Sequence, residues 1–128
     1  TRAHLVLFTL LDRDGEPLES SEQLEEVRQR LERSIIRSVR RSDLYTRYGK
    51  NQFLVLVTST DQDGCKIAAD RVCRNFRAVN RRRKIDVYYA CRPALAVSGD
   101  SLKRNMGKNV KELEIAEGSE KIKEKYGK

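Results

Sequence analysis

The first part of the chain alternates between short apolar runs and longer stretches with helical spacing. Residues 4–11 (HLVLFTLL) form a nearly continuous apolar run that is rich in β-forming residues. Such a run predicts a buried central strand, which the turn residues at positions 12–15 would end. The next stretch has apolar residues at spacings of three and four, as on one face of a helix. These residues are Leu24, Val27, Leu31, Ile35 and Val39.

The charges around this stretch support a helix. Ser20 and Gln23 have the spacing of a capping box, which predicts the beginning of the helix. Glutamates lie near its start and arginines near its end, which is the order that the helix dipole favours.

A β-hairpin is predicted next, with arms at residues 44–48 and 53–57 joined by residues 49–52. We expect Gly49 and Asn51 to supply the positive φ angles of a tight connection. Residues 61–64 (DQDG) are interpreted as a loop, and a second helix follows, with apolar residues on one face. These are Cys65, Ala68, Ala69, Val72, Phe76 and Val79. Residues 85–91 predict a fourth strand, ended by Pro93.

The predicted order is therefore βαββαβ. Two strand–helix–strand crossovers returning to one sheet indicate an α+β, ferredoxin-like core, with antiparallel strands in the sheet and both helices on one face. We assign residues 1–94 to this core and residues 95–128 to a C-terminal extension. The extension has only weak helical spacing, interrupted by Gly107. It is expected to be partly helical, and either to dock on a surface or to fray.

Composition narrows the class of protein. A chain of 128 residues fits one domain, and its net charge of +8 favours anionic partners. No apolar run is long enough to span a membrane, and the first residues lack the features of a signal peptide. The three cysteines form no CxxC pair, which argues against a disulfide framework or zinc site and favours a cytoplasmic protein. The missing initiator Met suggests a domain from a longer protein.

The hairpin and the end of the helix before it carry a family resemblance. The helix ends in Arg40-x-x-Asp43, and an Arg-Tyr strand leads into Gly49-Lys50-Asn51-Gln52-Phe53 and an apolar strand. This pattern resembles the signature of the GGDEF domain of bacterial diguanylate cyclases. The order of elements matches that family from about His4 to Pro93, so the resemblance implies the nucleotide-cyclase type of ferredoxin-like fold.

The signature departs from the family at the residues that carry chemistry. The resemblance implies that two Mg²⁺ ions are held by acids of the hairpin and by an Asp after the first strand. Here Asn51 and Gln52 replace the acids, and amides are poor Mg²⁺ ligands. Asp12 is retained as a vestigial ligand, and residues 15–18 replace the family's guanine-reading segment. We therefore expect no catalytic residues, no metal site and no cofactor, and a chain that is not an enzyme.

A second family site persists in part. The resemblance places Arg40, Asp43 and Arg71 at the positions of the inhibitory site for cyclic di-GMP. An Arg fork suits a phosphate or a guanine edge, and an Asp accepts from guanine N–H groups. The alternative is structural, because Arg also suits a helix C-terminus and Asp suits a turn.

The function expected from the sequence is that of a non-catalytic GGDEF-like domain in a larger bacterial protein. It would act by self-association, by contact with a partner or by binding cyclic di-GMP. The hairpin is also similar to domains appended to bacterial transcriptional regulators of the SARP/BTAD type. That resemblance implies a covalently linked DNA-binding domain or a homodimer. The lack of a long apolar run predicts no association with a membrane.

The alternative is a nucleic-acid-binding module of the RNA-recognition type, which shares the βαββαβ order and tolerates a basic surface. Arg81–Lys84 could contact phosphates, and the strand tyrosines could stack on bases. These tyrosines are Tyr45, Tyr48, Tyr88 and Tyr89. Against this function, the third predicted strand has a single aromatic residue, Phe53, whereas the RNA-recognition pattern needs several.

Overall fold

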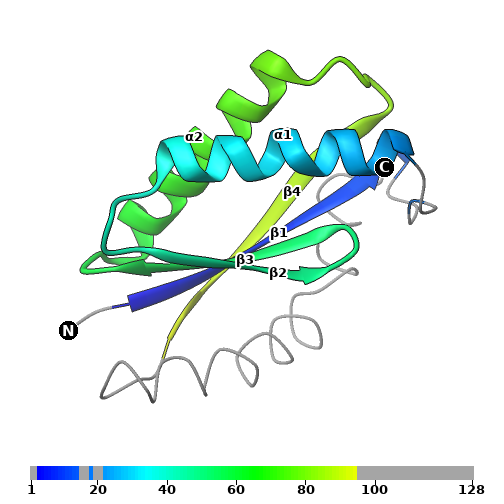
Figure 1. Ribbon diagram of the computed structural model, residues 1–128. Helices are drawn as coiled ribbons and strands as arrows, with labels where there is room; N and C mark the ends of the chain where they lie inside the picture. The colour runs from blue at the N-terminus through cyan, green and yellow to red at the C-terminus, as the bar shows by residue number, and fades with distance from the viewer. Residues whose placement is uncertain (1–2, 15–17, 19–21, 95–128) are drawn as a thin grey trace.

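The fold is taken from a computed structural model, which describes residues 3–14, 18 and 22–94. Six elements follow one another in the predicted βαββαβ order (Figure 1). They are β1 (Ala3–Asp12), α1 (Glu22–Ser38), β2 (Leu44–Gly49), β3 (Gln52–Thr58), α2 (Gln62–Val79) and β4 (Ile85–Pro93).

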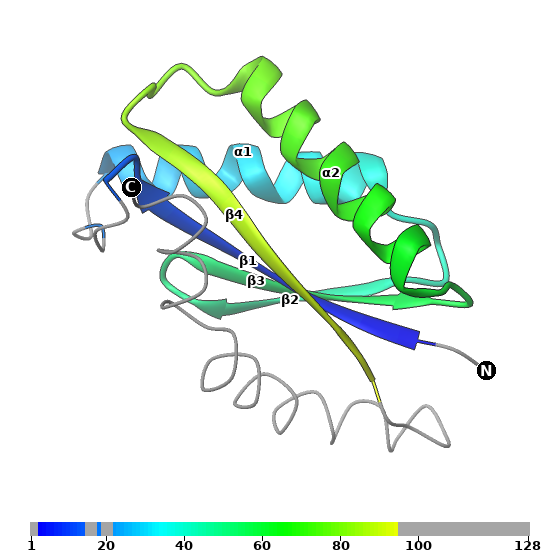
Figure 2. The same cartoon turned by 180° about the vertical axis from the view of Figure 1, so that it is seen from behind.

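The four strands form one sheet in the order β2-β3-β1-β4, and each neighbouring pair is antiparallel. Both helices cover the same face of this sheet, as the two opposite views show (Figures 1 and 2). The predicted α+β, ferredoxin-like core is therefore confirmed. The helices α1 and α2 also contact each other and cross above the sheet (Figure 1).

Strand β1 is buried on both of its faces, which explains its continuous apolar run. Val6, Phe8 and Leu10 point into the main core, between the sheet and the two helices. Leu5 and Leu7 belong to a second apolar cluster on the other side, with residues of β3 and β4. The chain thus places its most apolar strand at the centre of the sheet, as the sequence predicts.

Helix α1 buries the predicted stripe but ends one residue before Val39. Leu24, Val27, Leu31 and Ile35 are at most 1% exposed, and Val39 packs at the edge of the same core. The predicted capping residue Ser20 lies outside the described residues.

Helix α2 begins at Gln62, so the prediction that residues 61–64 form a loop is wrong. Asp61 is the N-cap, and its Oδ1 accepts a hydrogen bond from the Gly64 N–H at 2.8 Å. Because the cap satisfies this backbone donor, the helix starts within the polar segment. A Cβ at position 64 would lie 2.1 Å from Thr60 Oγ1, so any other residue there would require the Thr60 side chain to move.

The predicted hairpin is present, but its connection differs from the expectation. A β-bulge lies between Arg47 and Gly49. Neither Gly49 nor Asn51 has a φ angle in the left-handed region. Among the described non-glycine residues, only Ser59 has a positive φ, of 55°, in the connection from β3 to α2. The prediction of positive φ at the hairpin is therefore wrong.

Candidate functional site

The signature hairpin lies against the end of β1, which contacts it through both backbone and side chains. The Asn51 carbonyl accepts a hydrogen bond from Leu10 N–H, and the Asn51 side chain donates to the Leu10 carbonyl, both at 2.8 Å. Gln52 Nε2 donates to Thr9 Oγ1 at 3.2 Å. The two amides that replace the family's acids therefore connect the hairpin to the central strand.

The other signature residues are divided between core and solvent. Phe53 is fully buried, and its ring lies 6.5 Å from that of Tyr45. Gly49 is half-buried and Lys50 is exposed. Lys50 is thus the signature residue most open to a ligand.

These residues do not fit a pair of Mg²⁺ ions. Asp12 is the only acid among the three positions that match family metal ligands, and Asn51 and Gln52 direct amide N–H groups toward β1. Asp12 Oδ1 accepts a hydrogen bond from the Asp14 N–H at 3.0 Å. In the parts of the chain that the structure describes, no three His, Cys, Asp or Glu residues lie together as metal ligands. We therefore derive no step through a metal ion.

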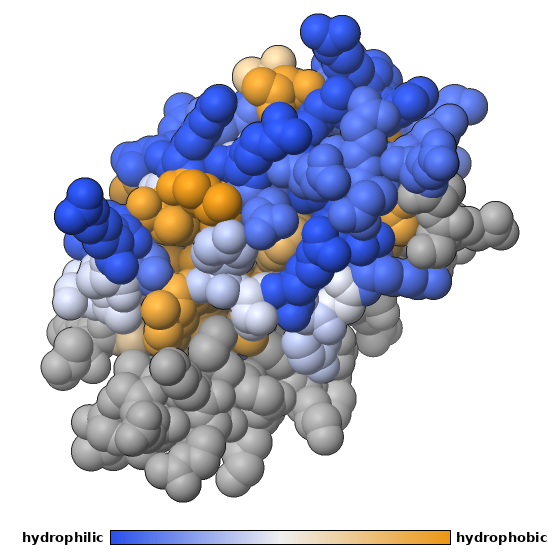
Figure 3. All heavy atoms as spheres, in the orientation of Figure 1, coloured by the Kyte–Doolittle hydropathy of each residue, from blue (hydrophilic) through white to orange (hydrophobic). Residues whose placement is uncertain are grey.

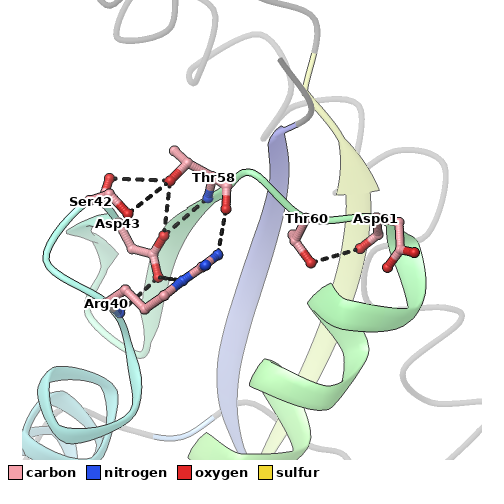
Figure 4. Close-up of polar contacts among 6 residues, drawn as sticks. All are labelled: Arg40, Ser42, Asp43, Thr58, Thr60 and Asp61. Atoms are coloured by element: carbon pink, nitrogen blue, oxygen red, sulfur yellow. Dashed lines mark hydrogen bonds and ion pairs between the residues drawn. The ribbon is translucent and has the colours of Figure 1, made fainter.

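The second candidate site is a corner formed after α1 and at the end of β3, which we call the Arg40 corner (Figure 4). It consists of Arg40, Ser42, Asp43 and Thr58. The Asp43 side chain is 3% exposed. One of its oxygens accepts from the Arg40 N–H at 2.9 Å, and the other accepts from the Thr58 N–H at 3.0 Å and the Thr58 hydroxyl at 3.3 Å.

Arg40 lies over this buried acid. Its Nη2 donates to the Thr58 carbonyl at 2.6 Å, and its Nε lies 4.0 Å from Asp43 Oδ2. Its side chain is nevertheless 59% exposed. Asp43 thus acts as a positioning residue that connects two loops, and Arg40 presents a held guanidinium to solvent (Figure 4).

Arg71 lies on the exposed face of α2, one turn before Asn75. The Asn75 amide donates to Ser38 Oγ at 2.9 Å, at the end of α1. This contact places the Arg71 side of α2 near the segment that leads to Arg40. Within the described residues, Arg40 and Asp43 contact each other, whereas neither forms a hydrogen bond or ion pair with Arg71, so the three predicted residues do not form one network.

A basic groove between the helices was not predicted from the sequence. It has a volume of about 420 Å³. Its lining residues are Arg30, Arg33, Ser34, Arg37, Asn75, Ala78 and Val79. The spacing of the three arginines, which places them on one side of a helix, was the available signal. In Figure 3, hydrophilic side chains dominate the surface over both helices.

Contacts within the fold hold the strand tyrosines Tyr45, Tyr88 and Tyr89. The Tyr45 hydroxyl donates a hydrogen bond to Glu32 at 3.0 Å. Burial raises the pKa of Tyr45, and the hydrogen bond and charge of Glu32 raise it further. Tyr89 donates to Asp70 at 2.8 Å, and Tyr88 is buried against Leu11. These residues do not form an exposed platform for stacking bases.

The order of elements, the antiparallel sheet and the signature hairpin define a domain of the nucleotide-cyclase type. A family model described as "Diguanylate cyclase, GGDEF domain" matches residues 19–114, which is more than half of the chain. The chain belongs to this GGDEF family. No curated protein sequence matches it.

Solved structures agree with this assignment at the level of the fold. A diguanylate cyclase protein from Thermotoga maritima has a TM-score of 0.61 and 16% identity, with coverage of 90% of this chain and 78% of that one. An EAL/GGDEF domain protein from M. capsulatus has a TM-score of 0.60 and 15% identity, with coverage of 91% and 78%. The diguanylate cyclase SiaD from Pseudomonas aeruginosa, solved with its activator SiaC, has a TM-score of 0.57 and 16% identity, with coverage of 84% and 44%.

These findings correct one expectation from the sequence. We expected a chain that is not an enzyme, because Asn51 and Gln52 replace the hairpin acids. The family and its fold are those of diguanylate cyclases, which are enzymes, so that expectation is contradicted. A substitution of ligands in one hairpin is not sufficient to remove a chain from an enzyme family.

Two further expectations are affected in different ways. The family assignment does not favour the nucleic-acid-binding alternative. The boundary at residue 94 stays a prediction, and the extension at residues 95–128 lies outside the described residues. In the described part of the chain, no helix is long and apolar enough to cross a membrane.

Proposed function

We propose that this GGDEF domain is a signalling module of a larger bacterial protein and binds cyclic di-GMP through Arg40 and Arg71, with Asp43 as the positioning residue. Binding is passed on by self-association or by contact with a partner. The proposal concerns this corner and does not depend on what happens to GTP at the hairpin.

The observation that carries the proposal is the geometry of Arg40. Its guanidinium is anchored at one nitrogen by the Thr58 carbonyl, yet more than half of the side chain is exposed. An Arg fork forms charge-assisted, bidentate hydrogen bonds with phosphates, and it can pair with the acceptor edge of guanine. A held side chain loses less conformational entropy on binding than a free one.

Arg71 supplies a second exposed cation, one helical turn before Asn75. The Asn75–Ser38 hydrogen bond fixes the helix crossing, so the distance from Arg71 to the end of α1 is set by packing. A cyclic dinucleotide carries two phosphates, and two separated arginines match two anionic groups. The net charge of +8 favours the approach of such a ligand.

Calorimetry with cyclic di-GMP and the full chain tests the proposal. We expect measurable binding, a loss of about tenfold or more in affinity for Arg40→Ala, and a smaller loss for Arg71→Ala, since a charged hydrogen bond contributes roughly 1.5–3 kcal/mol. Arg83→Ala is the matched control, because Arg83 is an exposed arginine beyond the far end of α2. Absence of binding, or equal affinities for the wild type and Arg40→Ala, would overturn the proposal.

A separate experiment tests how binding of cyclic di-GMP is passed on, by self-association or by contact with a partner. The diguanylate cyclase SiaD, a structural neighbour, was solved in complex with its activator SiaC. We propose that this domain likewise responds through an interface of its own. Light scattering with and without cyclic di-GMP is expected to show a change in mass, and an unchanged monomer would exclude self-association as the output.

We also propose that the larger protein is a cytoplasmic regulator. No disulfide joins Cys65, Cys73 and Cys91 in the structure, which suits a reducing compartment. Fractionation of cells that express the full-length protein is expected to place it in the soluble fraction. Recovery with membranes would contradict this part of the proposal.

A further inference from the structure

Two of the cysteines lie in contact although they are far apart in the sequence. Cys65 is in the first turn of α2, and Cys91 is near the end of β4. Their Sγ atoms are 3.5 Å apart and share a hydrogen bond. Cys65 has no exposed surface, and Cys91 is 8% exposed.

The environment distinguishes the two sulfurs. The hydrogen bond with Cys91 lowers the pKa of the Cys65 thiol, although burial and the charge of Asp43 act in the opposite direction. The same hydrogen bond, together with burial, raises the pKa of the Cys91 thiol. Cys65 also lies at the N-terminal end of a helix, which favours a thiolate. Cys65 is therefore the better nucleophile, and Cys91 the residue that follows it in reaction.

We propose that Cys65 and Cys91 are a disulfide-forming pair that is oxidised by hydrogen peroxide. The Cys65 thiolate attacks one peroxide oxygen and the O–O bond breaks, which gives a sulfenic acid on Cys65 and, after protonation of the leaving hydroxide, water. The Cys91 sulfur then attacks the Cys65 sulfur, the S–O bond breaks, and a second water leaves with the Cys91 proton. Two thiols lose two electrons, and the peroxide gains them.

Access to the pair comes from the edge of the sheet. Strand β4 is at the end of the strand order and pairs only with β1 among the described strands, where Cys91 is opposite Val6. Edge strands open locally at lower cost than central ones. A small peroxide can thus reach Cys91 and then Cys65 without unfolding of α1 or β3.

The third cysteine provides an internal control. Cys73 lies on the same helix as Cys65, two turns further along, and is also buried. It has the same solvent protection, but Cys91 Sγ is placed against Cys65. Burial alone therefore predicts equal reactivity for Cys65 and Cys73, whereas the pairing predicts a link that contains only Cys65 and Cys91.

The test treats the full, folded chain with hydrogen peroxide, alkylates the remaining thiols under denaturing conditions and maps peptides by mass spectrometry without reduction. We expect a Cys65–Cys91 peptide, an alkylated Cys73, and a rise in Tm of about 5 °C or more that dithiothreitol reverses, since the bond closes a long loop. Cys73→Ala should behave like the wild type. Cys65→Ala should abolish the link, and Cys91→Ala should leave Cys65 as a sulfenic acid that forms no disulfide.

Two outcomes would overturn the proposal. One is three intact thiols in folded protein after exposure to excess peroxide, and the other is a link that includes Cys73 or a second molecule. If the alanine variants fail to fold, the wild-type peptide map decides the question alone. No nucleotide is present in the experiment, so its result is independent of the proposed binding of cyclic di-GMP.

Discussion

The hairpin end and the Arg40 corner are two polar regions of one sheet, and they use their side chains in opposite ways. At the hairpin, Asn51 and Gln52 direct their amides inward and bond to the end of β1. At the corner, the acid Asp43 is directed inward and the base Arg40 lies outward above it. The amides of Asn51 and Gln52 are therefore occupied by hydrogen bonds within the fold, whereas the Arg40 guanidinium is anchored but stays exposed to solvent.

This difference indicates what leaves a polar side chain available to a ligand. A side chain that must satisfy neighbouring backbone groups is occupied, whereas one whose neighbours already have hydrogen-bond partners stays available. The Leu10 carbonyl and N–H lie beside the hairpin, and one Asn satisfies both of them. At the corner, Asp43 satisfies the N–H groups of Arg40 and Thr58, which leaves the Arg40 guanidinium with exposed donors. The following substitutions test this division of roles.

The largest effect on stability is expected for Asp43→Ala. The substitution leaves the backbone N–H groups of Arg40 and Thr58 without their acceptor, and we expect a loss of about 2–4 kcal/mol in the free energy of unfolding. Urea denaturation measures it. Asp43→Asn keeps one acceptor oxygen and should lose less. A loss below about 1 kcal/mol for Asp43→Ala would show that Asp43 is not the anchor of the corner.

Asn51→Asp comes next. The substitution places a carboxylate oxygen against the Leu10 carbonyl, where an N–H donor now lies at 2.8 Å. We expect a loss of roughly 1–3 kcal/mol in the free energy of unfolding. Lys50→Ala, at the exposed neighbouring position, is the control and should change stability by less than about 0.5 kcal/mol. Equal stabilities of Asn51→Asp and the wild type would mean that the hairpin is not held through its amide.

Tyr45→Phe tests a partly buried contact between β2 and α1. Loss of the hydrogen bond to Glu32 should lower the free energy of unfolding at pH 7 by about 0.5–1.5 kcal/mol. Because the pKa of Tyr45 is raised in the folded state, its contribution is present below pH about 10 and is lost as the pH rises through the folded pKa. The difference between the wild type and the variant should therefore shrink at alkaline pH, and a difference that grew with pH would contradict the assignment.

The smallest effect is expected for Gln52→Ala. Its amide bonds to a hydroxyl at 3.2 Å, which is weaker than the carbonyl contact of Asn51. We expect a loss of about 0.5–1 kcal/mol in the free energy of unfolding. Thermal unfolding of Gln52→Ala, of Thr9→Val and of the two combined checks the pairing. Because both substitutions remove the same hydrogen bond, their losses of stability should not add.

The sequence predicted the fold because its apolar patterns are regular. The apolar runs at β1 and β3 and the apolar stripe of α1 are patterns that packing preserves. The start of α2 was missed because its first turn is polar and depends on one side chain, Asp61, which caps it. The left-handed residue was also assigned to the wrong loop, since Ser59 carries no signal that distinguishes it from other serines.

The candidate site was predictable only in part. The positions of Arg40 and Asp43 come from the family pattern, but the inward direction of Asp43 depends on Thr58, which belongs to another strand. The basic groove depends likewise on how α1 crosses α2, and no spacing within one helix shows which partner residues line it. The wrong expectation about enzymatic class came from weighing two substitutions more heavily than the pattern of the whole domain.

The division of charge along α1 has a consequence for the speed of encounters. Near its start, Glu25 and Glu26 are neutralised by ion pairs with Arg28 and Arg30. Towards its end, Arg33 and Arg37 line the groove and form no ion pair with an acid of the described residues. The molecule therefore has a positive pole, and its field reaches about one Debye length, roughly 10 Å at 0.1 M salt. Anionic molecules should arrive preferentially from that side, at rates that fall as salt is added.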